Sequence, residues 1–336
     1  MTHVLRAVVD ARDATHSQLR GWGWYVKALV KALRAVPGLE LETIERGWPG
    51  PEALFELAGL PRIARDADVL HVPNCFLPPR RPCAGVVTIH DLAFEQYPED
   101  FAPTTRAKYR EWTPRAARSA ERVIVPSSFT RQDLVARYGI DHDKIRVVPE
   151  GPVLPLGTRQ PPPGPYILGV GDLRKKKNFA RLATAFSQLH RARELQHRLI
   201  IAGLDTGEGA AIRAAAGDAP LELPGYVPDG ALDALIRGAD LLVHPSLYEG
   251  FGLILAEAMA RDVPLAVAHA TALPETAADA AMYFDPLDPG DIASAILRAL
   301  AAREGLVAAG RRRVAELSWT TAALETMQVY RAAAGM

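Results

Sequence analysis

Two glutamates, Glu249 and Glu257, stand in the stretch of this sequence that is best suited to chemistry. The stretch opens with an apolar run, Leu241–Val243, which is typical of a buried parallel strand. Gly250 and Gly252 then bracket a sharp turn, and apolar residues recur at helical spacing after it. Open α/β sheets bind ligands at such turns, beyond the carboxyl ends of their strands. We therefore expect the two carboxylates to contact different parts of one extended ligand.

A run of cations follows a second apolar strand, which is predicted at Tyr166–Val170. Arg174, Lys176 and Lys177 would lie on the turn between this strand and the next helix, where their charges could bind phosphate groups. Adjacent residues at a helix start point in different directions, so we expect only one of the two lysines to face a phosphate. The alternative, that the run is a solvated face, stays open.

Two glycines, Gly21 and Gly23, fall on the loop between the first strand, Leu5–Asp10, and the helix that follows. Glycine lets a backbone approach a phosphate group closely. Trp22 and Trp24 alternate with them and could stack on a sugar or another flat molecule, although half-buried packing would also explain them. A plain turn is the alternative for the whole loop.

His90 ends the apolar strand that is predicted at Gly85–His90, and Asp91 follows it. A histidine at a strand end is more often structural than catalytic. Asp91 could orient the imidazole ring or cap the next segment. The strand-end position alone therefore favours a structural role for His90.

The composition limits the class of protein. The 336 residues suffice for two domains of the usual size, and the formal net charge of zero does not suggest a nucleic-acid partner. No apolar run has the length of a transmembrane span, and the N-terminus is typical of a first strand rather than a signal peptide. Cys75 and Cys83 lack CxxC spacing and are expected to be reduced thiols. We therefore expect a cytoplasmic α/β protein.

Strand-like and helix-like segments alternate along the chain, which predicts mostly parallel sheets covered by helices. Strands are predicted at Leu5–Asp10, Leu39–Glu45, Val69–Val72, Gly85–His90, Arg122–Val125, Ile145–Val148, Tyr166–Val170, Arg198–Ala202, Leu221–Leu223, Asp240–His244, Pro264–Ala268 and Ala281–Phe284. Helices are predicted at Trp22–Val36, Thr104–Ser119, Ser128–Tyr138 and Thr320–Ala334. A proline-rich run, 152–165, is predicted to be a semi-rigid linker between an N-terminal domain, 1–151, and a C-terminal domain, 166–319.

The stretch around Glu249 and Glu257 resembles the E-x7-E segment of retaining GT-B glycosyltransferases, those of glycosyltransferase family 4 in particular. Other segments resemble this family in the same order: the G-x-G loop Gly21–Tyr25, the V-T-x-H-D-L motif Val86–Leu92, the V-G-x-L-x-x-R-K-N segment Gly169–Phe179 and the G-x-V-P segment Pro224–Asp229. Two positions depart from the pattern. Trp24 and Asp172 stand where many or some members carry arginine.

The resemblance implies the GT-B fold, in which two Rossmann-like domains face each other across a cleft. The N-terminal domain would bind the acceptor, the C-terminal domain would bind a nucleotide sugar, and the last helix, about 320–336, would pack back on the N-terminal domain. Catalytic roles are implied for His90, Lys177 and Glu249. Donor contacts are implied for Gly21, Gly23, Arg174, Lys176, Tyr226, Val227, Gly250, Phe251, Gly252, Leu253 and Glu257. Trp22, Trp24, His71 and Asn74 are weaker candidates for contacts with the acceptor.

The implied reaction is the retaining transfer of a hexose or deoxyhexose from a nucleotide sugar to a hydroxyl group of a glycan, a lipid-linked sugar or a small molecule. GDP-mannose is the first choice of donor, while UDP- and dTDP-sugars stay open. No cofactor and no metal are expected, because Asp66–Asp68 and Asp141–Asp143 precede strands and are better explained by capping than as metal-binding DxD motifs. The alternatives are a nucleotide-sugar epimerase of the same fold and a non-catalytic sugar-nucleotide-binding protein.

Overall fold

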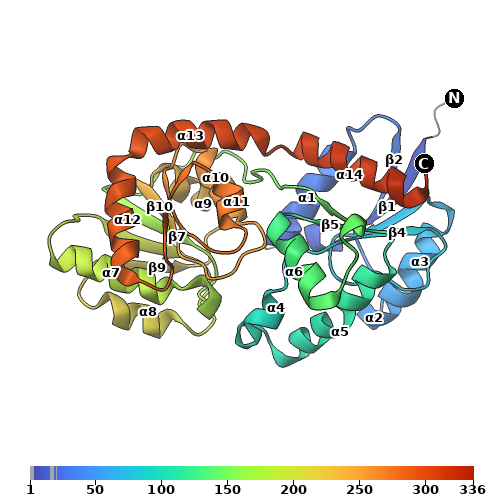
Figure 1. Ribbon diagram of the computed structural model, residues 1–336, viewed down its shortest axis with the longest axis horizontal. Helices are drawn as coiled ribbons and strands as arrows, with labels where there is room; N and C mark the ends of the chain where they lie inside the picture. The colour runs from blue at the N-terminus through green and yellow to red at the C-terminus, as the bar shows by residue number, and fades with distance from the viewer. Residues whose placement is uncertain (1–3, 16–18, 20) are drawn as a thin grey trace. The chain divides into compact units, whose positions relative to one another are not determined.

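The computed structural model describes residues 4–15, 19 and 21–336 (Figure 1). The chain forms two compact units. Unit 1 holds the residues up to 153 together with 318–336, and unit 2 holds residues 154–317. Within the described residues, no helix is long and apolar enough to cross a membrane.

Unit 1 is built on a parallel six-stranded sheet in the order β2-β1-β3-β4-β5-β6. The strands are β1 (Leu5–Asp10), β2 (Leu39–Ile44), β3 (Val69–Val72), β4 (Ala84–Thr88), β5 (Arg122–Val125) and β6 (Ile145–Val147). The helical segments are η1 (Arg12–Thr15), α1 (Gly21–Leu33), α2 (Glu52–Leu54), η2 (Phe55–Gly59), α3 (Leu60–Ile63), η3 (Ala64–Asp66), α4 (Ala93–Gln96), η4 (Pro98–Asp100), α5 (Pro103–Ser119), α6 (Ser128–Tyr138), η5 (His142–Lys144) and α14 (Trp319–Ala334).

Unit 2 is built on a second parallel six-stranded sheet in the order β12-β11-β10-β7-β8-β9. The strands are β7 (Tyr166–Val170), β8 (Arg198–Ala202), β9 (Leu221–Gly225), β10 (Leu241–His244), β11 (Leu265–Ala268) and β12 (Ala281–Phe284). The helical segments are η6 (Lys175–Lys177), α7 (Phe179–Arg191), α8 (Gly209–Ala216), α9 (Asp229–Arg237), α10 (Leu253–Met259), α11 (Leu273–Ala277), α12 (Pro289–Ala301) and α13 (Arg303–Glu316).

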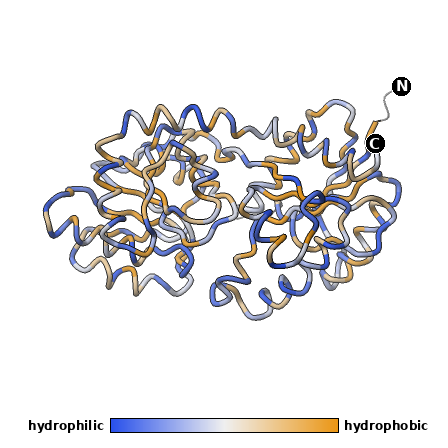
Figure 2. The backbone as a smooth tube through the Cα atoms, in the orientation of Figure 1, coloured by the Kyte–Doolittle hydropathy of each residue, from blue (hydrophilic) through white to orange (hydrophobic). Residues whose placement is uncertain are grey.

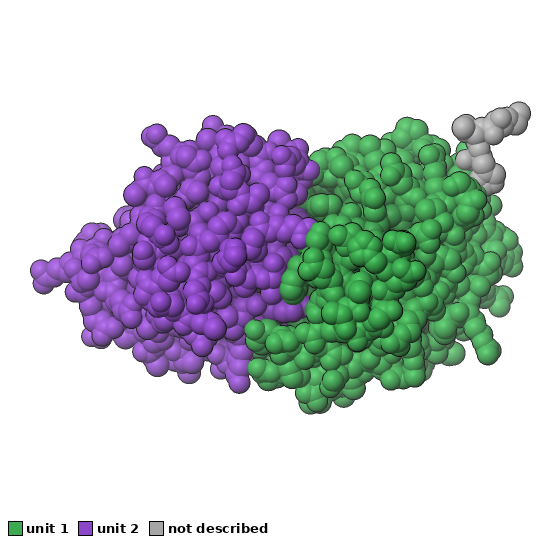
Figure 3. All heavy atoms as spheres, viewed as in Figure 1, with its two compact units in different colours: residues 1–153, 318–336 green, residues 154–317 purple. Residues whose placement is uncertain are grey.

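The two units are coloured separately in Figure 3, and Figure 2 colours the backbone by hydropathy. Each unit has its own hydrophobic interior. In unit 1, residues of α1 and α14, such as Leu29 and Tyr330, pack in one cluster with the sheet, while Ala116 and Leu134 of α5 and α6 pack in another. Apolar side chains therefore project from both faces of the strands, which explains why the strands are nearly continuous apolar runs in the sequence.

The strand order reverses at one place in each sheet. In unit 2, β7 pairs with β8 on one side and with β10 on the other, and in unit 1, β1 lies in the same way between β2 and β3. At such a reversal the connections leave in opposite directions and open a crevice at the carboxyl ends of the two central strands. The loops after β7 and β10 are therefore the first place to look for a site in unit 2.

The last helix, α14, belongs to unit 1 and packs against α1 (Figure 1). Its first residue, Trp319, donates its indole N–H to the carbonyl oxygens of Gly151 and Pro152, each at 3.0 Å. This side chain therefore holds the chain at the point where it leaves unit 1.

Candidate active site

The cationic turn and the glutamate-bearing turn meet at the carboxyl ends of β7 and β10. Lys177 Nζ donates to Glu249 Oε1 at 2.5 Å, and Lys176 Nζ lies 3.7 Å from Glu249 Oε2. The expectation that the two lysines point apart is wrong. They belong to a tight 3-10 turn, η6, and the Lys176 carbonyl accepts the N–H of Leu247 at 2.8 Å, which brings both ammonium groups beside the same carboxylate.

The charge of Glu249 is favoured by these neighbours. Burial raises the pKa of this carboxyl group, but the ammonium groups of Lys176 and Lys177, with a contribution from His244, outweigh burial and hold the pKa of Glu249 well below its ordinary value. A buried carboxylate beside two cations can exchange partners with the hydroxyl and phosphate groups of a ligand. The cluster is therefore suited to a ligand that carries both.

His244, the last residue of β10, is a member of this cluster that sequence analysis missed. The side chain is buried, and its Nε2 lies 3.3 Å from Glu249 Oε1. Burial lowers the pKa of His244, and the ammonium groups of the two lysines lower it further. Glu249 raises it, but the pKa is lowered overall. Its place at the end of a strand, directly before the glutamate-bearing turn, could have identified it.

Two residues in the left-handed conformation shape the two turns. Asn178, with φ 59°, follows η6, and its amide donates to the carbonyl oxygens of Pro245 at 3.1 Å and Pro286 at 2.7 Å. Gly252, with φ 90°, precedes α10, and a Cβ atom there would lie 2.8 Å from Leu273 Cδ2. Asn178 therefore ties the lysine turn to β10, while Gly252 lets α10 begin directly after the glutamate.

The other residues on this turn that were predicted to contact the donor are buried or half-buried. Gly250 is buried, and Leu253 is the half-buried first residue of α10. The Phe251 ring lies in the core of unit 2, and its carbonyl oxygen accepts the hydroxyl of Thr276. A ligand could therefore meet Phe251 only through its backbone.

Glu257 lies within α10 and is 2% exposed. Its Oε1 accepts the N–H of Leu154 at 2.9 Å, and its Oε2 accepts Arg261 Nη1 at 2.6 Å. Arg261 Nε continues to Asp233 Oδ1 at 2.9 Å, and Asp233 Oδ2 accepts the N–H of Gly157 at 3.0 Å. This buried network fastens the start of the proline-rich run to α9 and α10. A carboxylate has about four acceptor positions, so the predicted ribose contact stays a prediction beside these bonds.

Three further predicted donor contacts are spread along the same edge of the sheet. Arg174 Nη2 lies 3.6 Å from Asp172 Oδ2. Tyr226 and Val227 follow β9 and are half-buried, and Val227 packs against the core of unit 2. Because β8 separates β9 from β7, this turn is farther along the edge from Lys177 than Glu249 is.

His90 follows β4 in unit 1 and is 8% exposed. Its Nδ1 lies 3.3 Å from Glu150 Oε1, and its Nε2 lies 3.1 Å from the carbonyl oxygen of Pro73. Asp91 accepts the N–H of Ala93, the first residue of α4, at 2.9 Å, and Glu150 is a carboxylate beside the imidazole. Sequence analysis missed Glu150 because it belongs to no motif that was recognised around His90.

The two predicted acceptor tryptophans face different surroundings. The Trp22 ring stacks on His90 with centroids 5.8 Å apart, and it lies nearly perpendicular to the Tyr109 ring, with centroids 5.6 Å apart. Trp24 instead lies beneath Lys27 Nζ, which is 4.8 Å from the ring centroid. The structure therefore brings Trp22, but not Trp24, to the His90 side chain.

The two predicted loop glycines lie in the first turn of α1, which begins at Gly21. A Cβ atom at Gly23 would lie 2.7 Å from the carbonyl oxygen of Asp13, whereas one at Gly21 would meet no described atom within 4 Å. Gly23 is therefore required by the close approach of η1 to α1. A ligand contact at Gly21 stays a prediction.

His71 and Asn74 were predicted to meet the acceptor. His71 is 0% exposed, with Nδ1 2.8 Å from the Tyr330 hydroxyl and Nε2 2.8 Å from the Thr88 hydroxyl, and burial lowers its pKa to about 3. The prediction for His71 is wrong, because both ring nitrogens link β3 to α14 and β4 inside the core. Asn74 is half-buried and donates to Asp13 Oδ2 at 3.0 Å, so it stays a candidate.

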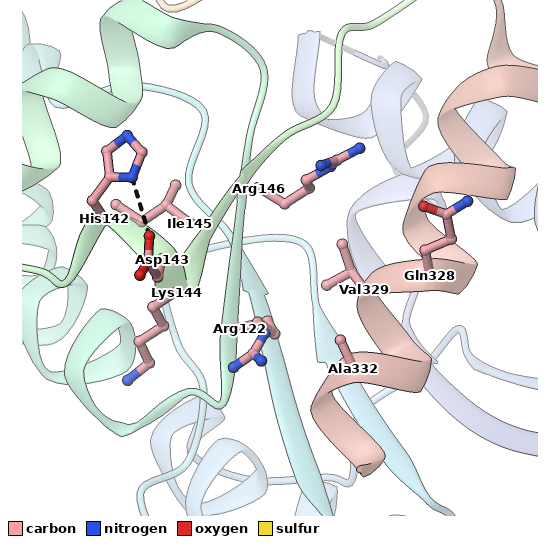
Figure 4. Close-up of a pocket in the computed structure, with 9 residues that line it drawn as sticks. All are labelled: Arg122, His142, Asp143, Lys144, Ile145, Arg146, Gln328, Val329 and Ala332. Carbon is pink, nitrogen blue, oxygen red and sulfur yellow. Dashed lines mark ion pairs between the residues drawn. The ribbon is translucent and has the colours of Figure 1, made fainter. Parts of the chain in front are cut away.

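A surface pocket of about 350 Å³ in unit 1 contains none of the predicted site residues (Figure 4). The residues that line it are Arg122, His142, Asp143, Lys144, Ile145, Arg146, Gln328, Val329 and Ala332. Lys144 Nζ donates to the carbonyl oxygen of Arg118 at 2.6 Å, and Arg146 Nη2 lies 3.2 Å from Glu325 Oε2. These two cations already have protein partners, so we assign no ligand to this pocket.

Comparisons with known proteins identify the family. Residues 29–152 match the family described as Glycosyltransferase Family 4, and residues 158–313 match Glycosyl transferases group 1. The chain is 30% identical to the O-antigen chain mannosyltransferase B of Escherichia coli over 283 residues, which are 78% of this chain and 74% of that protein. The chain belongs to glycosyltransferase family 4. The resemblance inferred from the sequence motifs is thereby confirmed.

This glycosyltransferase is also 26% identical to the MMP alpha-(1->4)-mannosyltransferase of Mycolicibacterium hassiacum over 326 residues, 86% of this chain and 77% of that protein. Its fold is similar to that of sucrose-phosphate synthase from Thermosynechococcus elongatus, with a TM-score of 0.73, 24% identity and coverage of 97% and 98% of the two chains. A glycosyltransferase from Rickettsia africae gives a TM-score of 0.71, 14% identity and 98% coverage of both. The predicted GT-B fold is confirmed.

Proposed function

We propose that this glycosyltransferase moves a hexose or deoxyhexose, in the first place mannose from GDP-mannose, to a hydroxyl group of its acceptor with retention of the anomeric configuration. The observation that carries the proposal is the cluster of Lys176, Lys177 and Glu249 at the point where the strand order of unit 2 reverses. The choice of mannose is supported by the two relatives that are named mannosyltransferases.

The roles in unit 2 follow from charge. Negative charge grows on the diphosphate as the bond to the sugar breaks, so fixed ammonium groups at Lys176 and Lys177 would stabilise the transition state more than the bound donor. Glu249 would accept hydrogen bonds from hydroxyl groups of the donor sugar, and Glu257 would accept them from the ribose. No cofactor or metal enters this scheme.

Retention is supported by the surroundings of His90. An inverting enzyme needs a general base whose lone pair reaches the acceptor hydroxyl. Both ring nitrogens of His90 face protein oxygens, Glu150 Oε1 and the Pro73 carbonyl oxygen, so neither is turned toward a substrate. Attack from the same face, in which the departing phosphate takes the proton of the acceptor, fits this arrangement better.

The acceptor is assigned to unit 1. Trp22 is half-buried and stacks on His90, and aromatic rings of this kind bind the apolar faces of sugars. Asn74 supplies an amide on the loop after β3. We therefore propose that a sugar hydroxyl of the acceptor is presented near Trp22 and Asn74.

Thermal unfolding with a panel of GDP-, UDP- and dTDP-sugars tests the donor. A ligand present at 100 times its Kd stabilises the protein by about 2.7 kcal/mol, and a weaker ligand at the same concentration stabilises it less. As the proposed donor, GDP-mannose should bind most tightly and therefore raise the melting temperature more than the other nucleotide sugars. Stabilisation by UDP- or dTDP-sugars alone would contradict the choice of GDP-mannose. An NMR time course with the best donor then tests the mechanism: the first product should keep the anomeric configuration of the donor, and inversion would contradict retention.

A further inference from the structure

His244 lies at the end of β10, directly before the glutamate-bearing turn, and is 1% exposed. In the part of the chain that the structure describes, neither ring nitrogen makes a well-aligned hydrogen bond, although Nε2 lies 3.3 Å from Glu249 Oε1. Buried polar groups are normally paired, since an unpaired one destabilises the fold. A buried imidazole aimed at a candidate catalytic carboxylate therefore requires an explanation.

The groups that face His244 decide which nitrogen carries the proton. They are Glu249 and the ammonium groups of Lys176 and Lys177. Burial and the two ammonium groups disfavour the imidazolium form, so the neutral ring, with one N–H donor and one lone pair, is the form to consider. A proton on Nε2 would lie on the side of Glu249, off the line to Oε1 but within 3.3 Å of it between heavy atoms, whereas a proton on Nδ1 would set the Nε2 lone pair against the carboxylate.

We propose that His244 is a positioning residue of the transfer reaction, and that its Nε2–H holds the Glu249 carboxylate while the lysines bind the diphosphate. The inference rests on the function proposed above for Glu249, Lys176 and Lys177. Oε1 is shared between Lys177 and His244, so when Lys177 turns to a phosphate oxygen, the imidazole is the donor that stays on Oε1. Glu249 then keeps its orientation toward the donor sugar.

A double-mutant cycle tests whether His244 acts through Glu249. His244→Leu removes the N–H donor and keeps an apolar side chain, while His244→Gln keeps an N–H donor near the position of Nε2. We expect His244→Leu to lower kcat about 10- to 100-fold, the range known for groups that orient metal ligands, with the acceptor KM unchanged. His244→Gln should restore most of this loss. In a Glu249→Ala background, His244→Leu should cause little further change.

Two results would overturn the inference. One is that the kcat losses of His244→Leu and Glu249→Ala multiply in the double variant. The other is that His244→Leu and His244→Gln lose the same fraction of kcat while their melting temperatures are equal. Nitrogen-15 spectra of the histidine-labelled wild type give a readout that needs no turnover. We expect His244 to be the neutral Nε2–H tautomer, with a proton signal that shifts in Glu249→Ala, and the Nδ1–H tautomer would overturn the inference as well. A wild type that transfers no sugar would contradict the proposed function, and the spectrum would still decide the pairing of His244.

Discussion

At the scale of single residues, the candidate site places one carboxylate against two cations. The Glu249 side chain lies between Lys176 and Lys177, and its low pKa means that the carboxylate stays charged at neutral pH. The diphosphate of a donor would compete with Glu249 for the ammonium groups. The hydroxyl groups of the donor sugar would then take the place of the ammonium groups beside the carboxylate. The donor would therefore exchange ion pairs that already exist, which would require little rearrangement.

Lys177→Ala is expected to lower kcat by about 10²–10³-fold and to raise the donor KM far less, because the ammonium group matters most when charge builds up on the leaving phosphate. Steady-state kinetics with the best donor measure both constants. Lys176→Ala should also lower kcat, since its Nζ lies 3.7 Å from Glu249. Lys175→Ala is the matched control, because Lys175 is exposed on the same turn. If all three variants resemble the wild type, the lysine turn is a solvated face.

Glu257→Gln is expected to have two effects. The amide loses the charge-assisted acceptor for the ribose, a change of roughly 1.5–3 kcal/mol in donor binding. Arg261 also loses one of its two buried carboxylate partners, which lowers the melting temperature. Calorimetry well below the melting temperature separates the two. Asp233→Asn serves as the stability control, because it weakens the same network without touching Glu257. Equal donor affinity for Glu257→Gln and the wild type would remove Glu257 from the site.

The motif residues could be predicted from the sequence, but most of their partners could not. Glu249, Lys176 and Lys177 stand in local patterns of strand, turn and helix that repeat within a family. The pairs Glu150–His90 and Asp233–Arg261 form only through the tertiary fold, over 60 and 28 residues, and no local spacing signals such a pair. His71 shows the opposite error, since a strand-end position does not distinguish a ligand contact from a core hydrogen bond.

At the scale of elements, the strands were the most predictable part of the molecule. The predicted bounds of β1, β3, β5, β7, β8 and β12 agree with the structure, because a strand buried on both faces leaves a continuous apolar run that glycine, proline or charge ends. The 3-10 turn η6 was not predicted, since three lysines carry no apolar pattern. This is why the directions of Lys176 and Lys177 were misjudged.

The network of α9 and α10 predicts a pH dependence of stability. Asp233 is 0% exposed; burial raises its pKa, but Arg237, the Gly157 N–H and Arg261 outweigh burial and lower it overall. A carboxyl group whose folded pKa is depressed contributes stability above its unfolded pKa, about 3.9, and loses it as the pH falls through the lower folded value. Denaturant unfolding should therefore show wild-type stability falling below about pH 4, and less steeply in Asp233→Asn.

At neutral pH, Asp233→Asn should destabilise the protein by about 3–5 kcal/mol, because it breaks a buried ion pair and leaves Arg261 with one carboxylate partner fewer. Asp262→Asn is the matched control. Asp262 makes two hydrogen bonds to Arg311, but both side chains are about half exposed or more, so its loss should change stability by no more than about 1 kcal/mol. If the two variants lower the free energy of unfolding equally, the burial of the Asp233–Arg261 ion pair does not increase its contribution to stability.

At the scale of the whole molecule, the proposed function divides the two substrates between the two units. Each has its own core and its own reversal of strand order, so each can hold one substrate at the carboxyl edge of its sheet. Unit 2 carries the lysine turn, whose cations would bind the diphosphate, and unit 1 carries the aromatic ring at Trp22, which would suit a sugar acceptor. The assignment of donor and acceptor to the units is a prediction that follows from this difference in chemistry.

The same division predicts that turnover is independent of divalent metal. In metal-dependent transfer a cation neutralises the leaving diphosphate, and here Lys176 and Lys177 would supply that charge. Activity in excess EDTA should therefore equal activity in calcium-saturated EDTA, the control for ionic strength. Added Mg²⁺ should leave the wild type unchanged but partly restore Lys177→Ala, because it returns positive charge to the phosphates. Loss of wild-type turnover in EDTA with recovery on adding Mn²⁺ would show that a metal carries the charge assigned to the lysines.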